Sequence, residues 1–258
     1  MQANPGYQIE TLDSVRFFKQ GDLRKGAASN SQWFSCGGNR TRSFSATGYF
    51  MGISLHHDKN IPIGIIQVQV GATPVEGWMS AEALRTHPDW QDLLREDYLQ
   101  FVMDHAENWS TIHVPDNIRP VWCYRYNLKP LIPYGIKGFT WYQGESNTAN
   151  QDETAGRTYQ SLMETLIQSW RAEWGQGDLP FIMVQIASLK TDTEKWIYVQ
   201  DAQRQALRVA NTALVVQNDN TDLSIHPVKD DSKRKAGERM TLAAKALAYG
   251  DAVEYSGP

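Results

Sequence analysis

Short runs of β-branched and other apolar residues alternate with longer amphipathic segments along most of the chain. The short runs span residues 62–70, 136–142, 180–186 and 213–217, and their composition is typical of parallel strands that are buried on both faces. The segments with helical spacing span residues 43–58, 88–107, 155–174, 195–210 and 232–249. This alternation predicts right-handed β-α-β units, and therefore an α/β fold with a mostly parallel sheet that helices cover on both faces.

Composition limits the class of protein. The 258 residues include 25 Lys and Arg against 29 Asp and Glu, a formal net charge of −4, and this balance argues against nucleic acid or an anionic membrane as the main partner. No apolar run approaches the roughly 20 residues that span a bilayer, and the first residues lack the basic and apolar regions of a signal peptide.

Two cysteines, Cys36 and Cys123, exclude a disulfide framework and leave open either one bridge or two buried thiols. Because repeats and linker-like stretches do not occur in the sequence, we predict one domain over residues 1–258.

The residues that directly follow the apolar runs are the first candidates for a site, because ligands of parallel sheets bind at the carboxyl ends of the strands. The first run is followed by Gly71, whose backbone N–H a ligand can approach closely; a plain strand-to-helix turn is the alternative. The second run is followed by Gln143-Gly144-Glu145-Ser146-Asn147. The amides and the carboxylate of this string could stabilise a developing oxyanion, and the alternative is a polar loop that caps the next helix.

A histidine follows the last apolar run. His226 has two carboxylates, Asp219 and Asp222, within seven positions. A base with an orienting carboxylate is half of a serine-hydrolase site, although a lone loop histidine is more often a surface residue. Metal catalysis is disfavoured, because the adjacent His56 and His57 point in different directions on a helix and no zinc-ligand spacing occurs elsewhere. Neither type of glycine-rich nucleotide-binding loop occurs, so no nucleotide cofactor is predicted.

Five strings of the sequence share their residues and their order with one known family. They are FSATGYF (44–50), GATPVEGW (71–78), WYQGESN (141–147), WR with GQGD (170–171 and 175–178), and IHP (225–227). In these strings the chain resembles the sialate O-acetylesterase family, which belongs to the SGNH (GDSL-like) hydrolases and is similar to acetyl-xylan esterases. The resemblance implies a three-layer α/β/α sandwich of the flavodoxin-like type and removal of acetyl groups from sialic acid or other glycans. It further implies an acetylated carbohydrate as partner and no cofactor, and relatives are often periplasmic or secreted.

The resemblance also implies a role for each matching residue. His226 would be the general base, which takes the proton from a serine and returns it to the leaving sugar hydroxyl. The Gly71 N–H, the Gln143 side chain and Asn147 would form the oxyanion hole, in which one donor is typically worth roughly 10²–10³ in rate. Glu145 would support its loop by hydrogen bonds.

The sequence departs from the family pattern beside the histidine. The family often has an acid two residues before its histidine, where this chain has Ser224. We therefore expect Asp222 to orient the imidazole, with Asp219 or a backbone carbonyl as the alternatives.

The nucleophile of the family has no counterpart in the sequence. In the family the serine lies in a Gly-Gln-Ser-Asn-Met string at the end of the first strand, and neither Ser35 nor Ser146 matches that position. We expect the serine and its strand directly upstream of Met1, and the chain as written to be nearly inactive, because loss of a nucleophile typically costs about 10⁶ in turnover. That strand would be internal, so without it two strands should lose ladder hydrogen bonds and a slot should open through the core. The alternative is a non-catalytic carbohydrate-binding protein of the same fold.

Overall fold

The computed structural model describes residues 7–20, 31–87, 120–149, 154–190, 194–227 and 231–256. The strands are β1 (Leu12–Lys19), β2 (Trp33–Cys36), β3 (Ile63–Gln67), β4 (Phe139–Trp141), β5 (Phe181–Val184) and β6 (Thr212–Val215). The α-helices are α1 (Gly38–Arg42), α2 (Ala46–Lys59), α3 (Ala81–Arg85), α5 (Thr154–Trp174), α6 (Lys195–Gln205) and α7 (Ser232–Tyr249). Short 3-10 or π-helical segments span Val75–Trp78, Tyr124–Leu128, Lys129–Leu131, Glu145–Ala149 and Ala206–Arg208.

Within the described part of the chain, the strands form two sheets of three strands each. In the first sheet β1 lies between β2 and β3, antiparallel to β2 and parallel to β3. In the second sheet β5 lies between β4 and β6, and both pairings are parallel. The predicted α/β fold with mostly parallel strands is confirmed.

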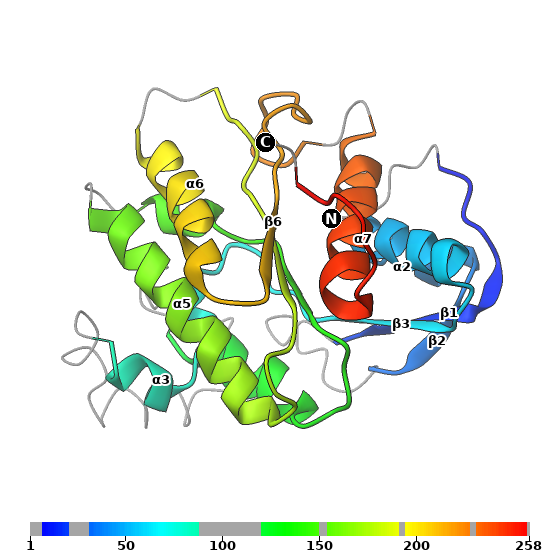
Figure 1. Cartoon of the computed structure of the whole chain (residues 1–258), viewed down its shortest axis with the longest axis horizontal. Coiled ribbons are helices and arrows are strands. Elements are labelled where there is room, and N and C mark those ends of the chain that lie inside the picture. Colours follow the sequence, from blue (N-terminus) through cyan, green and yellow to red (C-terminus); the bar gives the residue numbers. More distant parts are fainter. Residues whose placement is uncertain are drawn as a thin grey trace, which may run out of the picture.

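Helices cover both faces of the second sheet (Figure 1). On one face α5 and α6 share an apolar cluster with Phe181, Met183 and Leu214. On the opposite face α7 and part of α2 share a second cluster with Ile182 and Val184. Successive residues of β5 therefore point to opposite helix layers, as in a strand that is buried on both faces. This is the predicted three-layer α/β/α arrangement.

The first sheet contains two strands, β1 and β2, that the sequence analysis does not predict. In β1 the buried residues are Val15 and Phe17, and exposed or half-buried residues alternate with them. Such alternation is the pattern of a strand with only one face on the core, and it differs from the continuous apolar runs of the other strands. The predicted helix at residues 88–107 lies outside the described residues.

Helices α2 and α7 cross at Gly237 without room for a side chain. A Cβ atom at this position would lie 2.6 Å from Cβ of Phe50, 2.8 Å from the carbonyl oxygen of Thr47 and 2.9 Å from the backbone nitrogen of Met51. One turn further on, the hydroxyl of Thr241 lies 3.3 Å from the carbonyl oxygen of Met51. The absence of a side chain at Gly237 thus brings the two helix backbones close together above the strands.

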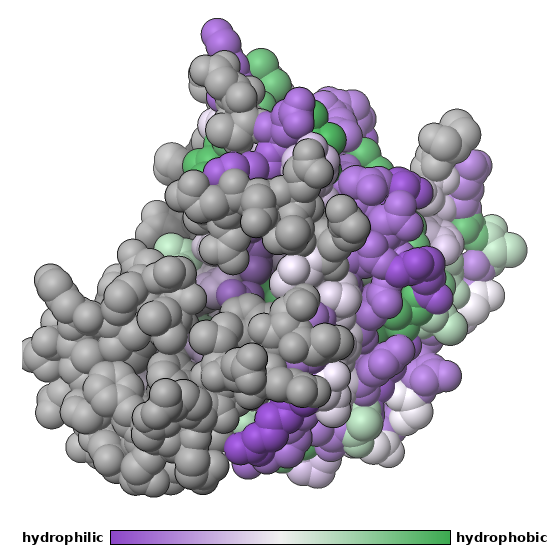
Figure 2. Space-filling view, turned by 90° about the vertical axis from the view of Figure 1, so that its left-hand side faces the viewer, coloured by the Kyte–Doolittle hydropathy of each residue, from purple (hydrophilic) through white to green (hydrophobic). Residues whose placement is uncertain are grey.

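Both cysteines are buried and neither is in a disulfide, so of the two possibilities that the sequence leaves open, the structure has two separate thiols. On the face shown in Figure 2 the described side chains are mainly hydrophilic, and the hydrophobic ones are scattered. Among the described helices, none combines the length and the apolar character that a membrane crossing requires.

Candidate active site

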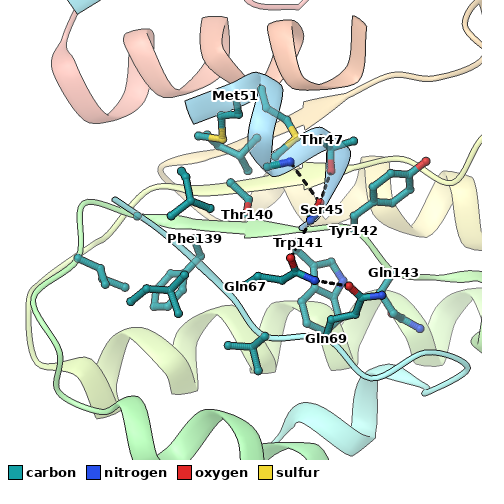
Figure 3. Close-up of a pocket in the computed structure, with 18 of the residues that line it drawn as sticks. Ser45, Thr47, Met51, Gln67, Gln69, Phe139, Thr140, Trp141, Tyr142 and Gln143 are labelled. Carbon is teal, nitrogen blue, oxygen red and sulfur yellow. Dashed lines mark hydrogen bonds between the residues drawn. The ribbon is translucent and has the colours of Figure 1, made fainter. Parts of the chain in front are cut away.

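A cavity of about 820 Å³ lies where the two sheets meet, and residues of both β3 and β4 line it (Figure 3). At the carboxyl ends of the strands its lining includes Gly71, Gln143, Glu145 and His226. These residues come from the loops after β3, β4 and β6. The loops that the sequence analysis selects therefore border one cavity.

His226 faces a carboxylate from a different loop. Its Nδ1 lies 3.4 Å from Oε1 of Glu145, and the two side chains are 49% and 15% exposed. The imidazole is therefore open to a ligand, while the carboxylate is largely shielded from water. A carboxylate at Nδ1 favours the tautomer with its proton on that nitrogen, which leaves the Nε2 lone pair available to accept a proton.

Asp222 holds the loop that carries the histidine. Its Oδ1 accepts hydrogen bonds from the backbone N–H of Ser224, at 3.1 Å, and from the Ser224 hydroxyl. Bonds of this kind close a turn of the backbone. The structure thus gives Asp222 a loop-closing contact and places Glu145 against the imidazole ring. The sequence analysis instead expects Asp222 to orient the imidazole and Glu145 to support its own loop by hydrogen bonds.

Gln143 joins the loops after β3 and β4. Its Nε2 donates to the carbonyl oxygen of Thr73 at 3.1 Å and to Oδ1 of Asn147 at 2.7 Å. The hydroxyl of Tyr159 donates to the backbone and side-chain oxygens of Gln143, at 3.1 and 3.2 Å. Both amide hydrogens of Gln143 therefore have partners within the protein, and one of them must be exchanged before this side chain can stabilise an oxyanion.

Asn147 makes a second connection between the same loops. It is 5% exposed. Its Oδ1 accepts from the backbone N–H of Val75, and its Nδ2 donates to Oε2 of Glu76, both at 3.0 Å. Burial raises the pKa of the Glu76 carboxyl, and hydrogen bonds, including the one from Asn147, oppose this effect. In this structure, then, Asn147 acts as a buried polar link between the strand ends.

Gly71 occupies an exposed position of the cavity lining, in the loop that follows the end of β3 at Gln67. The positive φ of this turn, 58°, occurs at Ala72 rather than at the glycine. Thr73 stabilises the turn, because its hydroxyl donates to the carbonyl oxygen of Val70 at 2.8 Å and accepts from the indole N–H of Trp78 at 3.0 Å. The backbone at Gly71 is thus positioned by the turn that follows it.

Lys233 is a residue of this region that the sequence analysis misses. It is 5% exposed. Its Nζ donates to the hydroxyl of Tyr142 at 3.2 Å and lies 4.9 Å from the centre of that ring. Burial lowers the pKa of Lys233 to about 8, and the negative charges of Glu145 and Asp222 oppose this shift. Lys233 could have been identified from the sequence, because it lies three residues before Ala236 on the apolar side of a predicted helix, and Ala236 is buried.

Comparisons with known proteins find carbohydrate esterases. Residues 124–246 match the family described as carbohydrate esterase, sialic acid-specific acetylesterase. A solved carbohydrate acetylesterase from Xanthomonas citri is similar over 96% of this chain and 52% of its own, with a TM-score of 0.75 and 28% identity. The predicted relationship to the sialate O-acetylesterase family is confirmed. The match of residues 124–246 includes the WYQGESN and IHP strings.

Curated relatives are also sialate O-acetylesterases. The human protein is 27% identical over 237 residues, which is 83% of this chain and 41% of that protein. The mouse protein is 27% identical over 255 residues, covering 83% and 44%. The chain thus spans less than half the length of these relatives. A solved protein from Arabidopsis thaliana, with 15% identity and a TM-score of 0.58, shares the fold.

Proposed function

We propose that this chain forms the base-bearing part of a carbohydrate O-acetylesterase that acts on acetylated sialic acid or other acetylated glycans. The contact between His226 Nδ1 and Glu145 Oε1, at one end of the cavity, carries the proposal. It is supported by the family match, and by the names of relatives that are carbohydrate or sialate acetylesterases.

In the proposed mechanism, His226 Nε2 takes the proton of a serine hydroxyl as the serine oxygen attacks the acetyl carbonyl. Glu145, with Asp222 closing the loop, stabilises the imidazolium that forms. The Gly71 N–H and an amide hydrogen of Gln143 or Asn147 bind the oxyanion. When the intermediate collapses, His226 returns the proton to the departing sugar oxygen. Water then cleaves the acetyl-serine by the same steps, releasing acetate.

None of the described residues occupies the position that the family's nucleophilic serine has at the end of its strand. Ser45 lies in the cavity lining, but its hydroxyl accepts from the backbone N–H of Gly48 at 3.2 Å and caps α2. Ser146 belongs to the loop after β4, beside the proposed oxyanion donors. We assign the nucleophile to a serine at the carboxyl end of a further strand between β3 and β4.

The test begins with the genomic sequence upstream of the Met1 codon. The longest reading frame and the present chain are expressed side by side and assayed with 4-nitrophenyl acetate and with O-acetylated sialic acid. We expect the longer protein to release acetate. His226→Ala should lower turnover by at least 10², the usual range for loss of a general base being about 10²–10⁴.

His57→Ala is the matched control, because Nε2 of His57 also contacts a glutamate, Glu10, at 2.9 Å but on the surface. This variant should keep full activity. Full activity in His226→Ala would remove that residue from the mechanism. If neither protein hydrolyses these esters but both bind the acetylated sugar, the non-catalytic alternative holds.

A further inference from the structure

Lys233 lies inside the protein at a helix position that is unfavourable for a positive charge. It is the second residue of α7 and is 5% exposed. The first turn of a helix carries a partial positive charge that repels a cation, and burial adds the cost of removing the ammonium from water. An apolar side chain could fill the same space without either cost. Packing therefore does not explain why an ammonium group occupies this position.

The group that accepts a hydrogen bond from this ammonium is neutral. Lys233 Nζ donates to the hydroxyl of Tyr142, which belongs to the cavity lining, at 3.2 Å (Figure 3). Burial, together with the negative charge of Glu145, raises the pKa of Tyr142, so the phenol keeps its proton at neutral pH. The hydrogen bond thus leaves the positive charge of Lys233 uncompensated, and its field extends to the charges beyond Tyr142.

Two carboxylates interact with this charge. The negative charges of Glu145 and Asp222 both raise the pKa of Lys233, against the larger effect of burial. Because the interaction between two charges is mutual, Lys233 stabilises both carboxylates in turn. Oε1 of Glu145 lies 3.4 Å from Nδ1 of His226, and Asp222 closes the loop that carries this histidine. The charge of Lys233 is therefore coupled to the surroundings of the imidazole.

The balance of charge around His226 depends on Lys233. Among the described residues, the loop after β4 contributes Glu145, the loop of the histidine contributes Asp222, and α7 contributes the ammonium. Asp219 forms an ion pair with an arginine of α7, so its charge is already compensated. Without the ammonium, two negative charges would favour the protonated imidazole. A protonated imidazole cannot take a proton from a serine.

We propose that the ammonium of Lys233 offsets the charges of Glu145 and Asp222 and so keeps His226 unprotonated at neutral pH, as a general base must be. This inference rests on the proposed function for its catalytic meaning. Lys233 is not part of the cavity lining, so it acts as a positioning residue, through the carboxylates, and not on the substrate. The cost of burying its charge is then the cost of setting the charge of the base.

The first test follows the titration of His226 by NMR, in the 258-residue chain with isotope-labelled histidine and with His226→Ala for assignment. We expect Lys233→Met to raise the midpoint of the His226 titration by at least about 0.5 pH unit. Lys235→Met is the matched control, because it removes the same charge from an exposed position in the same helix turn. Water and salt screen that position, so the midpoint should move by less than about 0.2 pH unit.

The second test measures the pH dependence of kcat/KM for 4-nitrophenyl acetate in the protein expressed from the longest reading frame. The acid limb of this profile reports the base of the free enzyme. In Lys233→Met it should move up with the NMR midpoint, so the loss should be about threefold at pH 6 and should shrink as the pH rises. Lys233→Arg keeps the charge and should restore the position of the acid limb. Thermal unfolding should show that Lys233→Met melts no lower than the wild type.

Three results would overturn the proposal. They are an unchanged His226 midpoint in Lys233→Met, equal shifts in Lys233→Met and Lys235→Met, and a loss of activity that is the same at every pH. The last result is the one expected from a merely structural role. A midpoint that moves in a protein without esterase activity would refute the proposed function and support the charge balance. Ester hydrolysis with an unmoved midpoint would support the function and refute the role of Lys233.

Discussion

Replacing Gly237 by alanine tests how closely α2 and α7 approach. In an ordinary helix interior this change is stabilising by about 1 kcal/mol, because alanine has the higher helix propensity. Here the new Cβ would lie within 2.9 Å of three atoms of α2, and two of them belong to the backbone. A backbone cannot rotate out of the way as a side chain can, so the helices must separate. Overpacking typically costs about 1–3 kcal/mol, and we place this case near the upper end.

The net expectation is a loss of about 2 kcal/mol, which for a chain of this size lowers the melting temperature by about 4–8 °C. Thermal unfolding followed by circular dichroism measures it. Gly52→Ala in α2 is the matched control, because its Cβ would meet Cγ1 of the Ile65 side chain at 3.2 Å and no backbone atom at shorter distance. We expect that variant to stay within about 1 kcal/mol of the wild type. A Gly237→Ala protein that is as stable as the wild type, or more stable, would refute the close crossing.

Three further substitutions have directions that follow from the structure. Lys233→Met should stabilise the protein at pH 7 by up to about 3 kcal/mol, because the native ammonium is buried and its pKa is lowered to about 8. This advantage should shrink between pH 8 and 10.5, as the native lysine loses its proton and with it the cost of burial; a difference that does not depend on pH would contradict the assignment. Glu76→Gln should stabilise at neutral pH, because burial raises the pKa of this carboxyl, and the gain should vanish as the pH falls towards 4.5, where the native carboxyl is also neutral. Arg171→Met should destabilise by about 2–4 kcal/mol in urea titrations, because the buried guanidinium donates to the carbonyl oxygens of Leu179 and Asn211, at 2.9 and 3.0 Å; an unchanged midpoint would show that these bonds contribute nothing.

The strands of the second sheet could be predicted because a strand that is buried on both faces has a continuous run of apolar residues in the sequence. Every residue of β5 and β6 is buried, so both strands read as continuous apolar runs. The strand β1 leaves a weaker trace, since only Val15 and Phe17 of its eight residues are buried. Its place in the sheet depends on pairing with β3, which follows it by more than forty residues, and such non-local pairing has no local signature.

The location of the candidate site could also be predicted, because the carboxyl ends of parallel strands meet at one edge of a sheet. The choice of the acid that contacts His226 could not. Asp222 is near in sequence, but its side chain closes a local turn, while Glu145 reaches the ring from the loop after β4. Proximity in the sequence favours Asp222 as the acid that contacts His226. The contact with Glu145 becomes visible only from the arrangement of the loops in space.

The anchoring of the loop after β4 has a consequence for ligand binding. The carbonyl oxygen of Gln143 accepts from Tyr159 of α5 and from Gln203 of α6, at 3.1 and 2.9 Å, in addition to the bonds that its side chain makes to the loop after β3. The conformational entropy of this loop is thus already lost when the chain folds. Association does not have to order it again, a cost of about 0.5–1.5 kcal/mol for each immobilised side chain. A small molecule arriving at this edge meets a preorganised surface, so its affinity depends on contacts and desolvation rather than on closing a loop.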